Sequence, residues 1–351
     1  MTEKIVVPLL TWYRENKRSL PWRDRNSAYI TWVSEIMLQQ TRVEAVKPYF
    51  ARFIKELPDV EALAGCPQER LLMLWEGLGY YSRVLNMQKA AIQVMEEYGG
   101  IIPGSFEELL SLKGIGRYTA GAIASIAYGV PVPAVDGNVL RVAARITENS
   151  QDIMKQSVRL AVEKELLEII PKDDPGDFNQ AIMELGAVVC VPNGPAKCEE
   201  CPVAAYCGAC QRGTQDRYPV KAPKKPRMIQ ERTVLVIQDG DRTAIRKRPS
   251  KGLLAGLYEL PNVEGHLGEE AAVRYARELG LDPLYIRPLP EAKHVFSHVE
   301  WRMIGYLIRV ASLEKSHEKE ILFAKKNEKE EKYAIPSAFG AYVRYMKEES
   351  E

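Results

Sequence analysis

The sequence has no long apolar run and almost no net charge. None of its apolar stretches reaches the roughly 18–20 residues with which a helix crosses a bilayer. The apolar stretch near the N-terminus is also too short and too soon interrupted for a signal peptide. We therefore expect a cytoplasmic protein without a membrane partner. The formal net charge of +1 neither favours nor excludes nucleic acid as a ligand.

Cysteine is scarce outside one segment. Five of the six cysteines fall within 21 residues, and the sixth, Cys66, is interpreted as a small apolar residue. In a long chain without a secretion signal, such crowding predicts a metal site and argues against a disulfide framework. The 351 residues, of which 46% are hydrophobic, suffice for two domains with cores of their own.

Hydrophobic periodicity divides the chain into three parts. Residues 1–211 carry apolar residues at helical spacing in successive segments, which predicts an almost entirely helical domain. Residues 212–230 are rich in lysine and proline and lack periodicity, so we interpret them as a basic linker. Residues 231–351 alternate apolar and polar residues around a turn at Asp239-Gly240 and contain one short helical pattern. This last part is therefore predicted to be a mixed α and β domain.

The clustered cysteines have the spacing C-x7-C-x2-C-x5-C. Four thiolates on one loop suit either a tetrahedral zinc ion or a [4Fe–4S] cluster, and the spacing alone does not decide between them. Zinc loops usually pair two short knuckles, whereas this loop has one, and Pro202 after the third cysteine is typical of iron–sulfur loops. Cys210 is left without a role. The four candidate ligands are Cys190, Cys198, Cys201 and Cys207.

Two glycines open an apolar helical pattern. Gly114 and Gly116 are expected to expose backbone N–H groups at the positive end of a helix, which suits a phosphate, although a tight turn between two helices explains the same pattern. Asp136 then follows an extended Pro-rich stretch and precedes another helix. Considered alone, an aspartate at that place is an ordinary helix N-cap.

Residues 112–136 together match a helix–hairpin–helix followed by a Gly/Pro-rich segment and an aspartate, the hallmark of one superfamily of DNA base-excision glycosylases. The chain resembles the MutY-type adenine DNA glycosylases over nearly all of its length. It departs from the family where seven residues separate the first two cysteines, because many members have six. The other motifs stand in the family's order: LPWR (20–23), WVSEIMLQQTRVE (32–44), WEGLGYYSR (75–83), AVDGNVLRV (134–142), GLLAGLYELP (252–261) and HVFSHVEW (294–301).

The resemblance implies a fold, a reaction and a cofactor. Residues 1–211 would form an all-α helix–hairpin–helix glycosylase domain with a [4Fe–4S] cluster on the loop 190–207, followed by the basic linker 212–230. Residues 231–351 would form an α+β Nudix-like domain that recognises 8-oxoguanine. The expected protein is a nucleoid-associated monomer that acts in base excision repair. It would hydrolyse the N-glycosidic bond of adenine mispaired with 8-oxoguanine or guanine in double-stranded DNA.

Two carboxyl groups would divide this chemistry. Cleavage of an N-glycosidic bond passes through an oxocarbenium-like state, which calls for one protonated and one ionised carboxyl. Glu35 stands among apolar residues that should raise its pKa, as a general acid requires, although a surface glutamate on an amphipathic helix is the ordinary alternative. Asp136 should be kept ionised by backbone N–H groups at a helix start. The resemblance implies that Tyr118 and Asn138 hydrogen-bond around Asp136 and position it.

Tyr118 also bears on the type of reaction. In the related endonuclease III group, a lysine at this point of the hairpin forms a Schiff base and the strand is cut. A phenol in its place implies a monofunctional glycosylase that leaves an abasic site. Two alternatives stay open: a bifunctional glycosylase/lyase of the endonuclease III kind, and a non-catalytic protein that binds DNA lesions.

Other residues match positions at which the family contacts DNA. Adenine must leave the base stack to react, and by resemblance Gln40 and Tyr80 lie beside the orphaned partner base. Phe296, Ser297 and His298 match the loop that inspects 8-oxoguanine. The Nudix-like part lacks the acidic run that nucleoside diphosphate hydrolysis needs, so it is interpreted as a reader. The residues that match the adenine pocket are Arg18, Trp22, Leu38 and Gln180.

Overall fold

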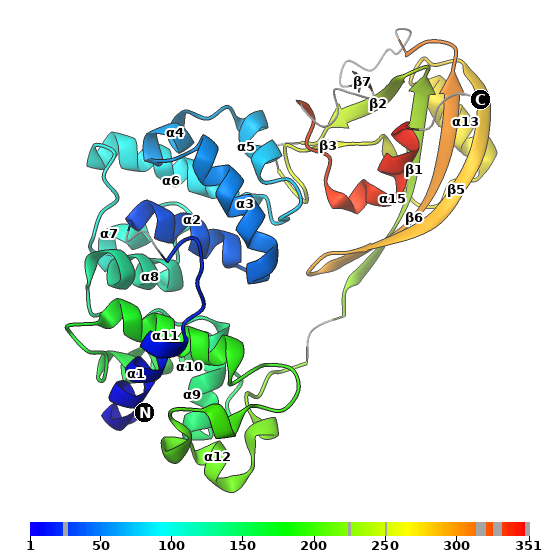
Figure 1. Cartoon of the computed structure of the whole chain (residues 1–351). Helices are drawn as coiled ribbons and strands as arrows, with labels where there is room; N and C mark the ends of the chain where they lie inside the picture. Colours follow the sequence, from blue (N-terminus) through cyan, green and yellow to red (C-terminus); the bar gives the residue numbers. More distant parts are fainter. Residues whose placement is uncertain (24–26, 224–225, 250, 314–320, 326–331, 348–351) are drawn as a thin grey trace. The chain divides into compact units, whose positions relative to one another are not determined.

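The computed structural model describes the chain except residues 24–26, 224–225, 250, 314–320, 326–331 and 348–351. Its contacts divide the chain into two compact units (Figure 1). The first combines Met1–Gly65 with Asn86–Pro223, and the second combines Cys66–Leu85 with Lys224–Glu351. Helices come first along the chain and a sheet with helices follows, which confirms the predicted fold class.

The first unit consists of packed helices and short 3₁₀ turns. Its elements are η1 (Glu3–Ile5), α1 (Val6–Asn16), α2 (Ala28–Leu38), α3 (Val43–Glu56), α4 (Val60–Gly65), the greater part of α6 (Ser82–Tyr98), α7 (Phe106–Ser111), α8 (Arg117–Tyr128), α9 (Gly137–Thr147), α10 (Gln156–Leu167), α11 (Pro175–Val188), η2 (Cys198–Glu200), η3 (Ala204–Tyr206), α12 (Gly208–Arg212) and η4 (Gln215–Arg217). Helix α2 packs against α3 and α8, α8 packs against α11, and α11 packs against α1 and α9.

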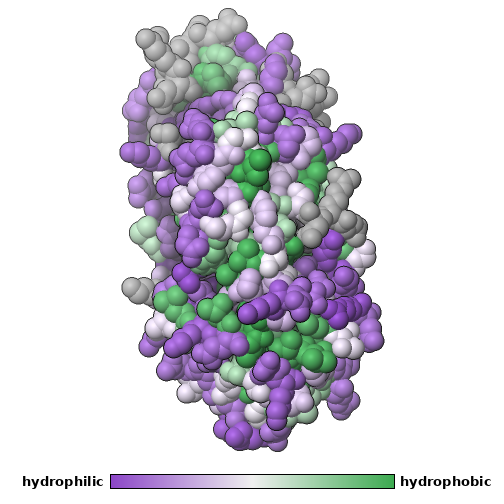
Figure 2. All heavy atoms as spheres, turned by 90° about the vertical axis from the view of Figure 1, so that its left-hand side faces the viewer, coloured by the Kyte–Doolittle hydropathy of each residue, from purple (hydrophilic) through white to green (hydrophobic). Residues whose placement is uncertain are grey.

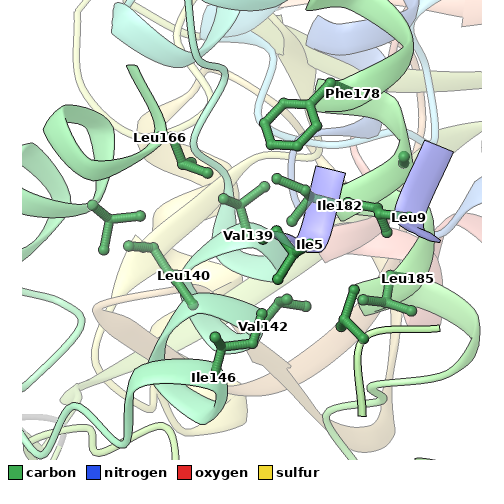
Figure 3. Packing of buried hydrophobic residues seen from close by; sticks show 14 of the residues in the cluster. Ile5, Leu9, Val139, Leu140, Val142, Ile146, Leu166, Phe178, Ile182 and Leu185 are labelled. Atoms are coloured by element: carbon green, nitrogen blue, oxygen red, sulfur yellow. The ribbon is translucent and has the colours of Figure 1, made fainter. Parts of the chain in front are cut away.

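One hydrophobic core of this unit lies between α1, α9 and α11 (Figure 3). On α9, Val139, Val142 and Ile146 recur at helical spacing and lie on one side of the helix. They pack with Ile182 and Leu185 of α11, and all five side chains are buried. Burial of each such side chain contributes roughly 1.5–3 kcal/mol, so this contact holds α9 and the residues at its N-terminus firmly in place.

The turn between α7 and α8 explains the first of the two glycines. Gly114 has φ 79°, and a Cβ on it would lie only 2.7 Å from the Cβ of Asn86. Both constraints exclude other residues at this position. Gly116 differs, because it has an ordinary φ of −97° and open space where a Cβ would stand. It precedes the first turn of α8, whose N–H groups have no partners within the helix.

The Pro-rich stretch before α9 is held by one buried amide. Asn179 on α11 is 1% exposed and accepts a hydrogen bond from the N–H of Ala134 at 3.0 Å. Its Nδ2 donates to the carbonyl of Val132 and to Oγ of Ser125, both at 2.9 Å. Gly121 of α8 approaches the same stretch so closely that a Cβ would lie 2.3 Å from the carbonyl oxygen of Pro133. The extended stretch is thus clamped between α8 and α11, and it leads directly to the start of α9.

The second unit is a mixed sheet with helices on its faces. Its elements are α5 (Gln68–Leu74), β1 (Met228–Asp239), β2 (Arg242–Lys247), β3 (Tyr258–Glu259), β4 (Asn262–Glu264), α13 (Glu269–Glu278), β5 (Pro283–Val295), β6 (Val299–Val310), β7 (Ile321–Lys325), η6 (Ser337–Phe339), α15 (Gly340–Val343) and η7 (Arg344–Lys347). The strand order is β3-β2-β1-β6-β5, with β4 paired to β1 and β7 paired to β2.

The central strand β1 runs parallel to β6 and antiparallel to β2, to which it is joined through the turn at Asp239-Gly240. Alternate residues of β1 enter two different cores, as the twofold period of a strand requires. Val234 and Val236 pack with α15, whereas Leu235 and Ile237 pack with α13 (Figure 1). The two helices therefore cover opposite faces of the sheet.

Polar side chains dominate the face of the molecule drawn in Figure 2, and apolar side chains are gathered in patches between them. Within the described residues, no helix is both long enough and apolar enough to pass through a membrane.

The clamp at Asn179 can be tested by changing its amide to a carboxyl. Asn179→Asp keeps the shape but places an oxygen opposite the carbonyl of Val132, so two donated hydrogen bonds are lost in a buried site. We expect the free energy of unfolding to fall by about 2 kcal/mol or more. Chemical denaturation followed by circular dichroism measures this loss.

The matched control is Asn149→Asp. There the side-chain oxygen accepts a hydrogen bond from the N–H of Gln151 at 2.9 Å, which an aspartate can also accept. A change within about 0.5 kcal/mol is expected for such a position. Equal effects of the two substitutions would show that Asn179 does not clamp the stretch.

Candidate active site

Glu35 lies inside the first unit. Helix α2 is apolar on nearly all sides, so packing against α3 and α8 buries its polar residues as well. The Glu35 side chain is 8% exposed. The hydroxyl of Tyr118, in the first turn of α8, donates a short hydrogen bond to Oε2 of Glu35. The same hydroxyl lies 3.7 Å from Sδ of Met183 on α11, so three helices meet at this carboxyl.

Burial raises the pKa of Glu35 to about 7, the direction predicted from its apolar neighbours. The hydrogen bond from Tyr118 opposes this rise, and the negative charge of Asp136 adds to it. A substantial fraction of Glu35 is therefore protonated at neutral pH. Because Oε2 accepts from Tyr118, Oε1 is the oxygen left to carry the proton. Burial also raises the pKa of Tyr118 well above its usual value, so the phenol stays protonated.

Asp136 is the N-cap of α9, where its Oδ1 accepts a hydrogen bond from the N–H of Val139 at 2.8 Å. Its Oδ2 accepts a second one from Nδ2 of Asn138 at 2.7 Å. The structure thus brings Asn138 directly onto Asp136, whereas Tyr118 contacts Glu35. The sequence argument considered only N–H groups that favour the charged form. Burial outweighs them and raises the pKa of Asp136, while the hydrogen bonds and Arg141 act in the opposite direction.

Arg141 continues this network and was missed in the sequence. Its guanidinium donates to Oδ1 of Asn138 at 2.8 Å, to the carbonyl of Gly186 at 2.7 Å and to the carbonyl of Cys190 at 2.8 Å. An unbroken chain of hydrogen bonds therefore joins the carboxyl of Asp136 to the first candidate metal ligand. A signal was present, because Arg141 and Arg145 interrupt the apolar face of α9 four residues apart.

The cysteines after α11 line one small cavity. Arg145 donates a hydrogen bond to Sγ of Cys190 at 3.2 Å, and Gln215 donates one to Sγ of Cys198 at 3.3 Å. Soft sulfur donors around a cavity, with N–H groups aimed at two of them, fit an anionic iron–sulfur cluster. In the described part of the chain, no three cysteine, histidine or acidic side chains are arranged as ligands of a single ion. The lining cysteines are Cys190, Cys198, Cys201, Cys207 and Cys210.

The residues assigned to the adenine pocket fall into two groups. Trp22 and Gln180 line an open cavity of about 420 Å³ in the first unit. Arg18 instead forms a double hydrogen bond with the buried carboxylate of Glu184, at 2.7 and 2.9 Å, and Arg23 bonds to the same group at 2.8 Å. These bonds lower the pKa of Glu184 to about 2 despite its burial, so it is ionised. Sequence reasoning missed Glu184 and Arg23.

Leu38 and Gln40 lie at the end of α2. Leu38 is half-buried one turn after Glu35, and Gln40 is exposed with φ 58°. In the second unit, Tyr80 has φ 47° and is 46% exposed. A left-handed backbone is strained for residues other than glycine, and such strain gathers at functional sites. Gln40 and Tyr80, which were predicted to lie beside the orphaned partner base, both have this backbone conformation.

Phe296, Ser297 and His298 form the turn between β5 and β6 in the second unit. The N–H of Phe296 donates to the carbonyl of Val299 at 2.8 Å, which closes the turn. The Phe296 ring packs on the buried ring of Trp301, with centroids 4.9 Å apart, while Ser297 and His298 are exposed. Two small hydrogen-bonding side chains are thus presented to solvent on a turn anchored by an aromatic contact.

Comparison with known proteins agrees with the two-part fold. Residues 33–172 match the HhH-GPD superfamily of base excision DNA repair proteins, and residues 233–345 match the NUDIX domain. An adenine DNA glycosylase of Homo sapiens is 36% identical to this chain. The alignment covers 83% of this chain and 64% of the human protein. One of Buchnera aphidicola from Acyrthosiphon pisum is 32% identical, covering 93% of this chain and 94% of its own length.

The solved structure of a non-covalent endonuclease III–DNA complex also resembles this chain, with a TM-score of 0.52 and 25% identity over 61% of the chain and 99% of that protein. The adenine glycosylase relatives match most of the chain, including both parts of the fold. The chain belongs to the adenine DNA glycosylases, a family of monofunctional glycosylases that hydrolyse an N-glycosyl bond in base excision DNA repair.

Proposed function

We propose that this protein removes adenine mispaired with 8-oxoguanine or guanine from double-stranded DNA, acting as a monomer on the nucleoid in the cytoplasm. The observation that carries the proposal is the pair of carboxyls of buried Glu35 and half-buried Asp136. Glu35 has its pKa raised to about 7, and Asp136 accepts hydrogen bonds that favour its charged form. Two such groups with different proton affinities are what cleavage of an N-glycosidic bond requires.

In this mechanism, the proton on Oε1 of Glu35 is transferred to the departing adenine. The ionised Asp136 faces the positive sugar that develops, and Asn138 and the N–H of Val139 hold that carboxylate in place. Tyr118 orients Glu35 through its hydrogen bond. A protonated phenol is a poor nucleophile, so no Schiff base forms at this position, in contrast to the lysine of the endonuclease III group. A water molecule adds to the anomeric carbon of the sugar cation and loses a proton, so the product is an abasic site in an uncut strand.

The adenine must first leave the duplex. The N–H groups that follow Gly114 and Gly116 at the start of α8 suit a backbone phosphate, and the open space at Gly116 leaves room for it. Gln40 and Tyr80 are each exposed, as a residue that enters a gap in the base stack must be.

Replacing Glu35 by glutamine tests the reaction. Glu35→Gln keeps the size but removes the transferable proton, so excision should slow by roughly 10²–10⁴ while DNA binding persists. The substrate is an end-labelled duplex with one adenine·8-oxoguanine pair, and product strands are separated with and without later alkali. Cleavage only after alkali is expected from the wild type. Its rate should fall as pH rises through about 7, because Glu35 then loses its proton.

The exposed Glu61 on α4 offers a matched control, since Glu61→Gln should leave both rate and pH profile unchanged. Excision by Glu35→Gln within about tenfold of wild type, or cleavage without alkali, contradicts the proposed mechanism.

We also propose that the turn of Phe296, Ser297 and His298 reads 8-oxoguanine. The oxidised base differs from guanine by a carbonyl and an added ring N–H, and each good polar contact to a base discriminates by about 1–3 kcal/mol. Since Phe296 packs on Trp301, the double variant Ser297→Ala/His298→Ala removes the polar groups without removing the anchor. The preference for 8-oxoguanine over guanine in single-turnover excision should shrink by about tenfold or more.

The control for the reader is Asp241→Ala, on the exposed turn between β1 and β2 of the same unit. It should leave the preference unchanged. If the double variant slows excision opposite both partner bases by the same factor, the turn supports general affinity and does not read the base.

We propose further that Cys190, Cys198, Cys201 and Cys207 hold a [4Fe–4S] cluster. Bound there, the cluster would supply iron–thiolate bonds that order the loop between them, which carries the exposed Lys197. Anaerobically purified protein should be brown and contain about four irons per chain. Colourless and fully active protein with a single zinc ion contradicts the assignment.

A further inference from the structure

Five thiols, one more than a [4Fe–4S] cluster requires, line the cysteine cavity. The fifth is Cys210, which the four-cysteine motif leaves without a role. It lies on α12, whose N-cap is Cys207, so Cys207 and Cys210 are separated by nearly one helical turn and lie on the same side. Cys210 is half-buried and, like Cys190 and Cys201, packs against the core that contains Cys207.

Cys210 lies beside two of the motif cysteines. It lines the same cavity as Cys198 and Cys207, and it follows Cys207 on the short helix α12. Gln215, which comes shortly after α12, donates a hydrogen bond to Sγ of Cys198 at 3.3 Å, so the end of α12 lies close to the turn that carries Cys198.

The protein frame around this pair suits an exchange of ligands. Cys198 lies in the short turn η2, and its sulfur also accepts a hydrogen bond from Gln215, which follows α12 along the chain. Cys190 is placed differently, at the end of the buried helix α11 and fixed by Arg145. Replacement of Cys198 by Cys210 therefore requires only that the short elements η2 and α12 move relative to each other.

We propose that Cys210 is a reserve ligand of the cluster, able to take the place of Cys198 on the iron that Cys198 binds. The inference rests on the cluster proposed above. In the exchange, the bond between Cys198 and one iron would break and the released thiolate would take up a proton, while the Cys210 thiol would give up its proton and form one bond to the same iron. The cluster keeps four thiolate ligands and its charge, and no electron is transferred.

The test compares four full-length variants with the wild type: Cys198→Ala, Cys210→Ala, the double variant of both, and Cys201→Ala. Iron and sulfide per chain are measured after anaerobic purification, together with circular dichroism. The wild type, Cys210→Ala and Cys198→Ala should each contain about four irons. The double variant and Cys201→Ala should lose the cluster, because no thiol replaces the missing one.

Alkylation with iodoacetamide gives a second readout that does not depend on activity. Cys210 should be modified in the native wild type and protected in Cys198→Ala, where it binds iron. The proposal is overturned if Cys198→Ala contains about three irons, or as little iron as the double variant. It is also overturned if Cys198→Ala is unfolded while Cys210→Ala is folded. A wild type without iron refutes the cluster itself, which separates that failure from the failure of the reserve ligand.

Discussion

The negative charge of the half-buried Asp136 acts on the buried carboxyl of Glu35, so the protonation of Glu35 depends on the state of Asp136. Each of them alone is driven toward the neutral form by burial. The charge on Asp136 raises the pKa of Glu35 further, so an ionised Asp136 helps to keep Glu35 protonated. Asp136 can carry that charge only because donors surround it. Two elements of the first unit set the proton affinities of these carboxyls. Apolar α2 surrounds Glu35, and the N-terminus of α9 supplies the donors around Asp136.

The donors around Asp136 depend in turn on residues far from it. Asn138 is oriented by Arg141, and the Arg141 guanidinium is satisfied by the carbonyls of Gly186 and Cys190. A buried guanidinium without such acceptors would be costly, so this chain of hydrogen bonds is stable only when the residues after α11 are in place. The cysteine loop and the candidate catalytic carboxyl of Asp136 are therefore parts of one polar network.

Residues for chemistry and residues for reading DNA have opposite exposure. Glu35 and Tyr118 are enclosed by helices because an acid with a raised pKa needs an environment without water. Tyr80, Ser297 and His298 are exposed, and Tyr80 is held in a strained backbone conformation. Groups that enter a duplex or touch a base edge must project from the surface. The two requirements explain why the candidate catalytic residues all lie in the first unit, while the proposed reader turn lies on the sheet of the second.

Much about this protein was determined by the sequence alone, because the signals are local. Helical periodicity, the N-cap at Asp136 and the spacing of the cysteines involve residues close together in the chain, and they predicted the fold class and a set of candidate site residues. Apolar neighbours in α2 likewise indicated the raised pKa of Glu35. Tertiary structure alone decided the rest. The bonds from Arg18 to Glu184 and from Asn179 to Ala134 join distant segments, so their partners are defined only when helices pack. Distances in space also decide whether burial or hydrogen bonding has the larger effect on the pKa of a carboxyl. They likewise decide which cysteines lie side by side.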